Sequence, residues 1–319
     1  MTALRAAGLT KRYAGAPVVD ALDLAVGRGE LYGFLGPNGA GKTTTIRMAL
    51  GLIRPSGGDV ELLGESVVHG RPPLERVGAL VEEPAFWRYL SGRRNLKYFA
   101  RAGGSGEATR RRLRRIDDVL RTVGLASAAH KRVKAYSQGM RQRLGIALAM
   151  LGAPELLVLD EPTNGLDPQG MREIRQLLRR LADEGTSVFV SSHLLGEVEA
   201  LCDRVGVMAR GRLVAEGPPG GLRGTTDRVR LDVDDRGRAV SVLAGLEGVS
   251  HVDEPGGALR IRLDGGATVA SVNAALVHAG IGVEALVPER DTLEDVFLAL
   301  VGEDEAAATP NSEATDVPR

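Results

Sequence analysis

The sequence predicts an α/β domain with a mostly parallel sheet, followed by a small α+β domain. A glycine-rich loop near residue 40 separates a short apolar strand from a helix-compatible run. A continuously apolar stretch near residue 157 ends in two carboxylates, which is typical of a strand buried on both faces of a parallel sheet. After a break rich in proline and glycine near residue 219, apolar and charged residues alternate as in half-exposed strands.

Composition sets limits on the class of protein. The 319 residues are too many for one average domain. The formal net charge is +0, from 41 basic and 41 acidic residues, so we expect no nucleic-acid partner. The single cysteine, Cys202, excludes an internal disulfide and favours a reducing, cytosolic setting. The first residues lack the apolar core of a signal peptide. The longest apolar stretch, Leu144–Pro154, is shorter than the about 20 residues that cross a bilayer, so any action at a membrane requires another chain.

Changes in composition along the chain divide it into three regions. Residues 1–220 form the large expected domain, and the run Gly217–Gly221 reads as a linker. Residues 226–302 form the small domain, with the expected order β-α-β-β-α-β and an added closing helix that carries Leu293–Leu300. That order is typical of a split-βαβ, ferredoxin-like sandwich. Residues 303–319 are small, polar and acidic, and we expect them to be disordered because they have little to bury.

The strongest motif is the loop Gly36–Thr43, which fits G-x-x-x-x-G-K-[ST] at every fixed position. It follows the apolar strand Leu31–Leu35 and precedes the helix-compatible run Thr44–Leu52. The alternative is a glycine-rich turn that carries a lysine by chance, and such a turn would not need a strand before it and a helix after it. Glycines let the backbone wrap a phosphate, Lys42 would reach the β- and γ-phosphates, and Thr43 would bind Mg²⁺. The expected nucleotide-binding residues of this segment are Gly36, Asn38, Gly39, Ala40, Gly41, Lys42, Thr43 and Thr44.

A second motif is the apolar strand Leu156–Asp160 with Glu161 after it. Ligands of open α/β sheets bind at the carboxyl ends of the strands. Asp160 is therefore placed to hold Mg²⁺, and Glu161 is placed to activate the attacking water as a general base. Alone, such an acidic pair would more often be a solvated strand end.

With both motifs present, the chain resembles the ABC transporter ATPases over about Met1–Gly217. Tyr136–Gln142 is similar to the family's signature, usually LSGGQ, with Tyr136 and Gln138 as departures. The resemblance implies that Ser137 and Gly139 touch the γ-phosphate. An ordinary N-cap serine before a helix at Gly139–Leu151 explains Ser137 as well, and both roles are compatible.

Further positions resemble the family's pattern. Asn164–Asp167 is similar to the D-loop, which lies at the dimer seam. His193 matches the switch histidine, although a lone histidine there would usually be a helix cap or a surface residue. Tyr13 resembles the aromatic that stacks on adenine, and a plain strand-end tyrosine fits it nearly as well. The resemblance thus implies Glu161, His193 and Lys42 as the catalytic residues.

Glu82, after the strand Val77–Val81, departs from the family's pattern, because most members have glutamine there. A glutamate resembles the lantibiotic-immunity and bacitracin-resistance subgroup, and we expect it near Mg²⁺. Glu83 is the alternative if the register is off by one. The appended domain and the ending Leu293–Phe297 resemble daunorubicin-resistance ATPases. These likenesses indicate export.

The aromatic cluster Phe86, Trp87 and Tyr89 fits either a core or a partner-facing patch.

The resemblance implies an assembly. ATP and Mg²⁺ would bind between two such subunits arranged head to tail, as a homodimer, on the cytoplasmic face of the cell membrane. A separate transmembrane permease would use the resulting motion. The rival is an ABC ATPase with a soluble role in DNA repair or translation, which would usually carry a long coiled coil or two cassettes. The sequence shows neither sustained heptads nor a second phosphate loop. Glu161 argues against a module that binds nucleotide without turnover.

Overall fold

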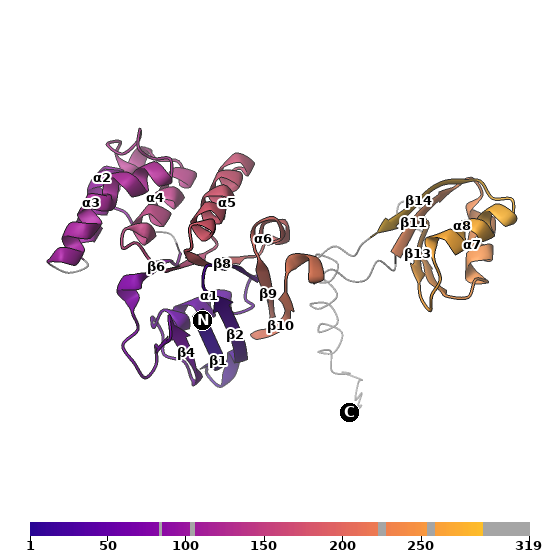
Figure 1. The fold of residues 1–319 in the computed structure, drawn as a ribbon, viewed down its shortest axis with the longest axis horizontal. Helices are drawn as coiled ribbons and strands as arrows, with labels where there is room; N and C mark the ends of the chain where they lie inside the picture. The colour runs from indigo at the N-terminus through magenta and orange to yellow at the C-terminus, as the bar shows by residue number, and fades with distance from the viewer. Residues whose placement is uncertain (83–84, 103–105, 223–227, 254–258, 290–319) are drawn as a thin grey trace, which may run out of the picture. The chain divides into compact units, whose positions relative to one another are not determined.

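The computed structural model of the chain describes residues 1–82, 85–102, 106–222, 228–253 and 259–289. It divides into two compact units, Met1–Pro219 and a second that begins at Gly220 (Figure 1). The division falls inside the proline- and glycine-rich break of the sequence. The expected closing helix around Leu293–Leu300 and the expected disordered tail 303–319 lie outside the described residues.

A mostly parallel sheet of six strands forms the centre of the first unit, in the order β10-β9-β3-β8-β7-β6. The pairs β9/β3, β3/β8, β8/β7 and β7/β6 are parallel, and β10 runs antiparallel to β9. Every residue of β3, β7 and β8 is buried, which confirms the predicted parallel sheet. The strands are β3 (Leu31–Leu35), β6 (Val77–Leu80), β7 (Leu156–Asp160), β8 (Ser187–Ser192), β9 (Arg204–Ala209) and β10 (Arg212–Gly217).

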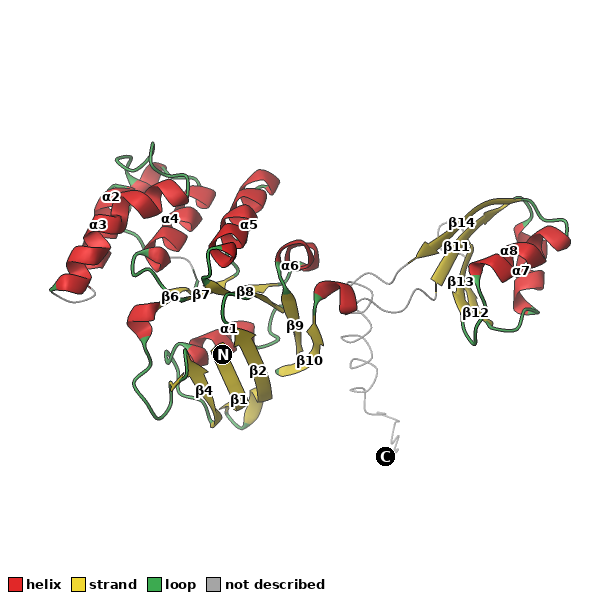
Figure 2. Cartoon of the chain, viewed as in Figure 1, coloured by secondary structure: helices red, strands yellow, loops and turns green. Residues whose placement is uncertain are grey.

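An antiparallel sheet in the order β2-β1-β4-β5 shares the core of this unit (Figure 2). Its core-facing residues Leu22 and Val60 belong to the same apolar cluster as Phe34 of the central sheet and Ile46 of α1. This sheet was not among the elements expected from the sequence. Its strands are β1 (Thr2–Tyr13), β2 (Ala16–Gly27), β4 (Gly57–Leu62) and β5 (Glu65–Ser66), and α1 spans Lys42–Ala49.

Helices complete the first unit. Three of them, α2 (Gly92–Ala102), α3 (Glu107–Thr122) and α4 (Gln138–Met150), form a helical part, in which α4 packs against β6 (Figure 1). Two others, α5 (Pro168–Asp183) and α6 (Leu195–Leu201), follow β7 and β8. Short 3-10 turns lie at Leu74–Arg76, Val133–Ala135 and Pro219–Gly221. Within the described ranges, no helix combines the length and the apolar character that crossing a bilayer requires.

The second unit confirms the predicted β-α-β-β-α-β order. Its strands pair antiparallel in the order β12-β13-β11-β14, the arrangement of a ferredoxin-like sheet. Helices α7 and α8 lie together on one face of this sheet (Figure 2). Val229, Ile261 and Leu276 belong to the apolar core between these helices and the sheet. The elements are β11 (Arg228–Val233), α7 (Arg236–Ala244), β12 (Val249–Asp253), β13 (Leu259–Leu263), α8 (Val269–His278) and β14 (Val283–Glu289).

Separate cores lead to a prediction about truncation. The apolar cluster of the first unit lies between Ala3 and Met208, and that of the second unit lies beyond Val229. We therefore expect a chain that ends at Gly221 to keep the urea unfolding midpoint of the first unit, measured by circular dichroism. A chain that ends at Gly211 is the control. It loses β10 and with it the hydrogen bond from Tyr32 Oη to Glu216 Oε1 (2.7 Å), so its midpoint should fall. Loss of the cooperative transition in the longer truncation would contradict the prediction.

Candidate functional site

The predicted motifs meet at one edge of the parallel sheet. Strands β3, β8 and β7 are neighbours, so the loops that follow their carboxyl ends lie side by side. These loops enclose a cavity of about 390 Å³. It is lined by Val18, Pro37, Asn38, Gly39, Gly41, Lys42, Thr43, Thr44, Glu161, Asn164 and His193.

The glycines of the loop Gly36–Thr43 are required by close backbone approaches. A Cβ on Gly36 would lie 2.5 Å from the carbonyl oxygen of Met208. Gly41 has φ +107°, and a Cβ there would lie 2.6 Å from the carbonyl oxygen of Val18. The loop therefore fits tightly between β9 and the β1–β2 hairpin, and α1 begins directly after it at Lys42.

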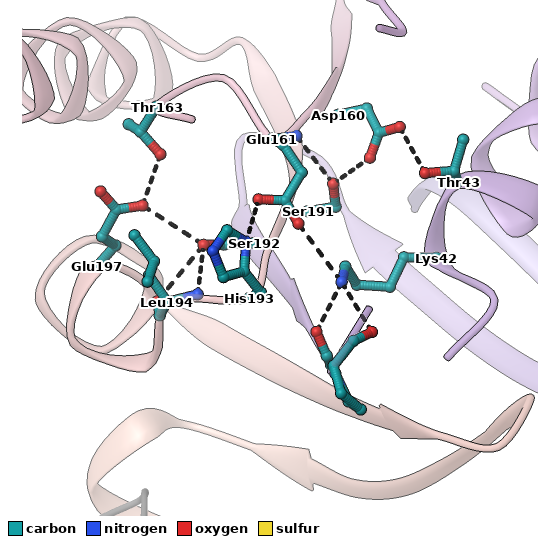
Figure 3. A network of polar contacts seen from close by, with 12 residues as sticks. Lys42, Thr43, Asp160, Glu161, Thr163, Ser191, Ser192, His193, Leu194 and Glu197 are labelled. Carbon is teal, nitrogen blue, oxygen red and sulfur yellow. Dashed lines mark hydrogen bonds and ion pairs between the residues drawn. The ribbon is translucent and has the colours of Figure 1, made fainter. Parts of the chain in front are cut away.

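Lys42 points back across its own loop. Its Nζ donates to the carbonyl oxygens of Gly36 (2.6 Å) and Pro37 (3.2 Å), and it lies 3.4 Å from Oε1 of Glu161 (Figure 3). The side chain is only 6% exposed. The ammonium group is thus held at the floor of the cavity, within reach of an anion that enters it.

Asp160 has both carboxylate oxygens engaged. Thr43 Oγ1 donates to Oδ2 (2.8 Å), and Ser191 Oγ donates to Oδ1 (2.5 Å). Ser191 Oγ also accepts from the backbone N–H of Glu161 (3.0 Å). A hydroxyl and a carboxylate lie together at the start of α1, and oxygen ligands of this kind suit Mg²⁺. The pair Thr43–Asp160 therefore fits the metal site that the sequence predicted.

Glu161 and His193 are in direct contact. Nδ1 of His193 lies 2.7 Å from Oε2 of Glu161, so the ring N–H can donate to the carboxylate (Figure 3). The other carboxylate oxygen faces Lys42, and Glu161 thus lies between two donors. Its backbone has φ +48°, a conformation that a residue with a side chain rarely adopts. Strain of this kind is typical of functional positions.

Ser137 and Gly139 lie elsewhere. They line a different cavity of about 570 Å³, together with D-loop residues Gly165–Asp167. Among the described residues, none lines both cavities. Ser137 is the N-cap of α4 and accepts from the backbone N–H of Met140 (3.2 Å), which confirms the helix-capping role. A single chain thus does not bring the signature residues to its own phosphate loop.

Tyr13 and Glu82 are not among the residues that line the cavity. Tyr13 lies at the β1–β2 hairpin, 49% exposed, with Lys11 Nζ 5.1 Å from its ring centroid. The carboxylate of Glu82 forms an ion pair with Arg47 of α1 and is 62% exposed. Glu83, the alternative for this position, lies outside the described residues. The roles of Tyr13 and Glu82 stay predictions.

Two residues at the site, Val18 and Ser191, had no predicted role, and Asn164 was predicted only as part of the D-loop. For Ser191 a signal existed, because a serine at the end of a buried apolar strand needs a polar partner. Val18 gives no such signal, since its carbonyl reaches the loop only through the folding of the hairpin.

Comparison with known proteins agrees with this geometry. The sequence model of the family described as "ABC transporter" matches residues 19–164. The bacitracin transport ATP-binding protein BcrA of Bacillus licheniformis is 40% identical over 94% of this chain and 98% of its own length. The daunorubicin resistance ATP-binding protein DrrA3 of Streptomyces coeruleorubidus is 40% identical over 95% and 97%. A solved ATP-binding subunit of an ABC transporter, 29% identical, superposes with a TM-score of 0.61 over 69% of this chain and 92% of its own.

The position of Ser191 yields a stability prediction. Replacing Ser191 with alanine would leave a buried oxygen of Asp160 and the backbone N–H of Glu161 each without this partner. Unsatisfied buried groups cost about 1–3 kcal/mol. We therefore expect Ser191→Ala to lower the free energy of unfolding by about that amount in urea titrations. Ser127→Ala, the same change at an exposed position, is the control and should have little effect. Equal stability of the two variants would contradict the prediction.

Proposed function

This chain belongs to the ABC transporter family, and we propose that its ATPase activity drives export of a drug, peptide or lipid-like cargo through a separate transmembrane subunit. It is an ATP-binding subunit that hydrolyses ATP to ADP and phosphate, as the family does. The relatives named for bacitracin transport and daunorubicin resistance span nearly the whole chain, second unit included, which supports export. They give no support to a role in DNA repair or translation.

The observation that carries the proposal is the meeting of Lys42, Glu161 and His193 in one cavity, beside the Thr43–Asp160 pair. The β- and γ-phosphates of ATP would compete with the loop carbonyls for the Lys42 ammonium group. Backbone N–H groups of the loop and of the first turn of α1 would bind the same phosphates. Tyr13, exposed at the hairpin, would stack on the adenine ring.

Glu161 would act as the general base. Its carboxylate lies at the mouth of the phosphate loop, where it can accept the proton of the attacking water. His193 donates to one oxygen of this carboxylate and so fixes its orientation. Lys42, on the other side, lies 3.4 Å from the second oxygen of this carboxylate.

Thr43 and Asp160 would hold Mg²⁺. When bound, the metal supplies positive charge that neutralises the charge developing on the phosphates. The Thr43–Asp160 hydrogen bond (2.8 Å) supports this assignment, because the two oxygens are already adjacent. Glu82 contacts Arg47 instead, so this pair does not depend on it.

A second copy would complete each site. Ser137 and Gly139 lie in a cavity of their own, beside the N-terminus of α4. A helix N-terminus and a serine hydroxyl suit a phosphate group. We infer that this cavity of one subunit faces the phosphate loop of the other, in a head-to-tail homodimer on the cytoplasmic face of the membrane.

An aromatic patch formed by Trp87 and Tyr89, just before α2, and Tyr98 of α2 would contact the transmembrane subunit. Trp87 and Tyr98 are in edge contact, with ring centroids 4.1 Å apart. Tyr98 is 52% exposed and Tyr89 is 67% exposed, whereas Phe86 is buried. The predicted aromatic cluster is thus partly core and partly surface. Exposed aromatic surface of this kind is typical of a partner contact.

The docking proposal predicts co-purification. Pulled down from a detergent extract, the tagged subunit should bring a transmembrane protein with it. The double change Tyr89→Ser and Tyr98→Ser should lower the recovered amount, while the ATPase rate of the isolated subunit stays the same. Leu52→Ser, at another exposed apolar position, is the control and should leave the recovery unchanged. Equal recovery with the tyrosine variant would refute this docking surface.

The base assignment predicts a separation of binding from turnover. Glu161→Gln keeps the shape but removes the base, and we expect kcat to fall by about 10²–10⁴-fold while ATP still binds. Size-exclusion chromatography with Mg-ATP should then show a dimer. Lys42→Ala should instead lose ATP binding, because it removes the only side-chain cation that lines the described cavity. Glu184→Gln, an exposed position, controls for the chemistry of the change. Wild-type turnover by Glu161→Gln would show that another group is the base.

A further inference from the structure

Behind the catalytic pair lies a buried glutamate to which the proposed mechanism gives no role. Glu197 is on α6 and is only 7% exposed. Its Oε2 accepts from Thr163 Oγ1 (2.6 Å) and from Ser192 Oγ (3.4 Å), as Figure 3 shows. Burying a carboxyl group is unfavourable unless hydrogen bonds compensate for the loss of water. The two hydroxyl groups are therefore the contacts that keep Glu197 in place.

These two hydroxyl groups belong to the segments that carry the catalytic pair. Thr163 lies two residues after Glu161, and Ser192 lies directly before His193. Ser192 Oγ also accepts from the backbone N–H of Leu194 (2.9 Å), so the hydroxyl spans the turn that contains His193. Glu197 thus joins the loop after β7 to the turn after β8. This link is separate from the direct contact between Glu161 and His193.

The contacts of Glu197 help to stabilise the unusual backbone conformation of Glu161. Glu161 has φ +48°, and surrounding contacts must maintain such a conformation. Asn164 N–H donates to the carbonyl oxygen of Glu161 (3.1 Å) and closes a tight turn. The hydroxyl group of Ser191 accepts from the backbone N–H of Glu161 and so holds one part of this turn. The carboxylate of Glu197 accepts from the hydroxyl group of Thr163 and holds another part. Both ends of the strained turn are therefore fixed.

The other oxygen of Glu197, Oε1, is buried and has no hydrogen-bond partner among the described residues. Packing alone would favour an apolar side chain here, because an unpaired buried oxygen is costly. Such a cost is typically retained where a group has a function. The cavity that would hold ATP is not lined by Glu197, so the function would be indirect.

We propose that Glu197 is a positioning residue for ATP hydrolysis, which acts through Thr163 and Ser192 to hold Glu161 and His193 in their working arrangement. The proposal rests on the proposed function, since it requires Glu161 to be the base. Because Glu197 lies behind the cavity, it affects the rate of the chemical step and leaves ATP binding unchanged.

The test combines Glu197→Met, which removes both carboxylate oxygens at nearly the same side-chain length, with Thr163→Val, which removes the hydroxyl group but keeps the shape. Full-length wild type, both single variants and the double variant are compared by kcat, by KM for ATP and by thermal unfolding. Each single variant should lower kcat at least about tenfold with KM unchanged, since small misplacements of reacting groups have effects of this size. The double variant should be no slower than the slower single variant, because both changes break one link. Ser192→Ala should lower kcat in the same way. Glu184→Met, at an exposed position, and Thr122→Val, at a half-buried position that does not line the cavity, should match wild type.

Each contrary result has its own meaning. If wild type hydrolyses ATP and the two single variants keep its kcat, the positioning role is wrong and the proposed function stands. If the effects of the single variants multiply in the double variant, Glu197 does not act through Thr163 and the proposal is wrong. If KM rises together with a loss of thermal stability at unchanged kcat, the role is structural only. If Glu161→Gln hydrolyses ATP as fast as wild type, the base assignment fails, and the positioning role fails with it.

Discussion

Three neighbouring parallel strands, β3, β8 and β7, hold the site together, because their carboxyl ends meet at one edge of the sheet. All of their residues are buried, so the strands have little freedom to slide or tilt. Tyr32 of β3 stacks on Phe189 of β8, with ring centroids 5.7 Å apart. Burial, with a hydrogen bond to Glu216, raises the pKa of the Tyr32 phenol, which therefore stays a neutral donor. The strand that leads into the phosphate loop is thus fixed on both sides.

The two carboxylates above this edge each lie between two groups that donate hydrogen bonds. Glu161 lies between the Lys42 ammonium group and the His193 ring, and Asp160 lies between the hydroxyl groups of Thr43 and Ser191. Each carboxylate therefore has a donor on both of its oxygens. Groups held in this way need little reorganisation when charge develops during a reaction, and this is the main source of electrostatic catalysis.

The same edge also carries strain and unpaired polar surface. Glu161 has a positive φ, Gly41 accepts a conformation closed to other residues, and Glu197 buries an oxygen without a partner. All three lie within or directly behind the cavity. Strain placed in this way belongs to a site that the rigid sheet can support.

From the sequence alone follow the loop Gly36–Thr43, the acidic pair Asp160–Glu161, the capping Ser137 and the topology of the second unit. Each of these depends on residues close together in the chain, where periodicity and turn chemistry act locally. The contacts between distant segments came only from the tertiary structure. Thr43 meets Asp160 across 117 positions, Thr163 meets Glu197 across 34, and Glu82 pairs with Arg47 across 35. The β2-β1-β4-β5 sheet depends on one contact of the same kind, since β1 pairs with β4 across the intervening β2, β3 and α1. Such pairings are set by how buried strands and helices pack against one another, and local sequence patterns contain no information about that packing.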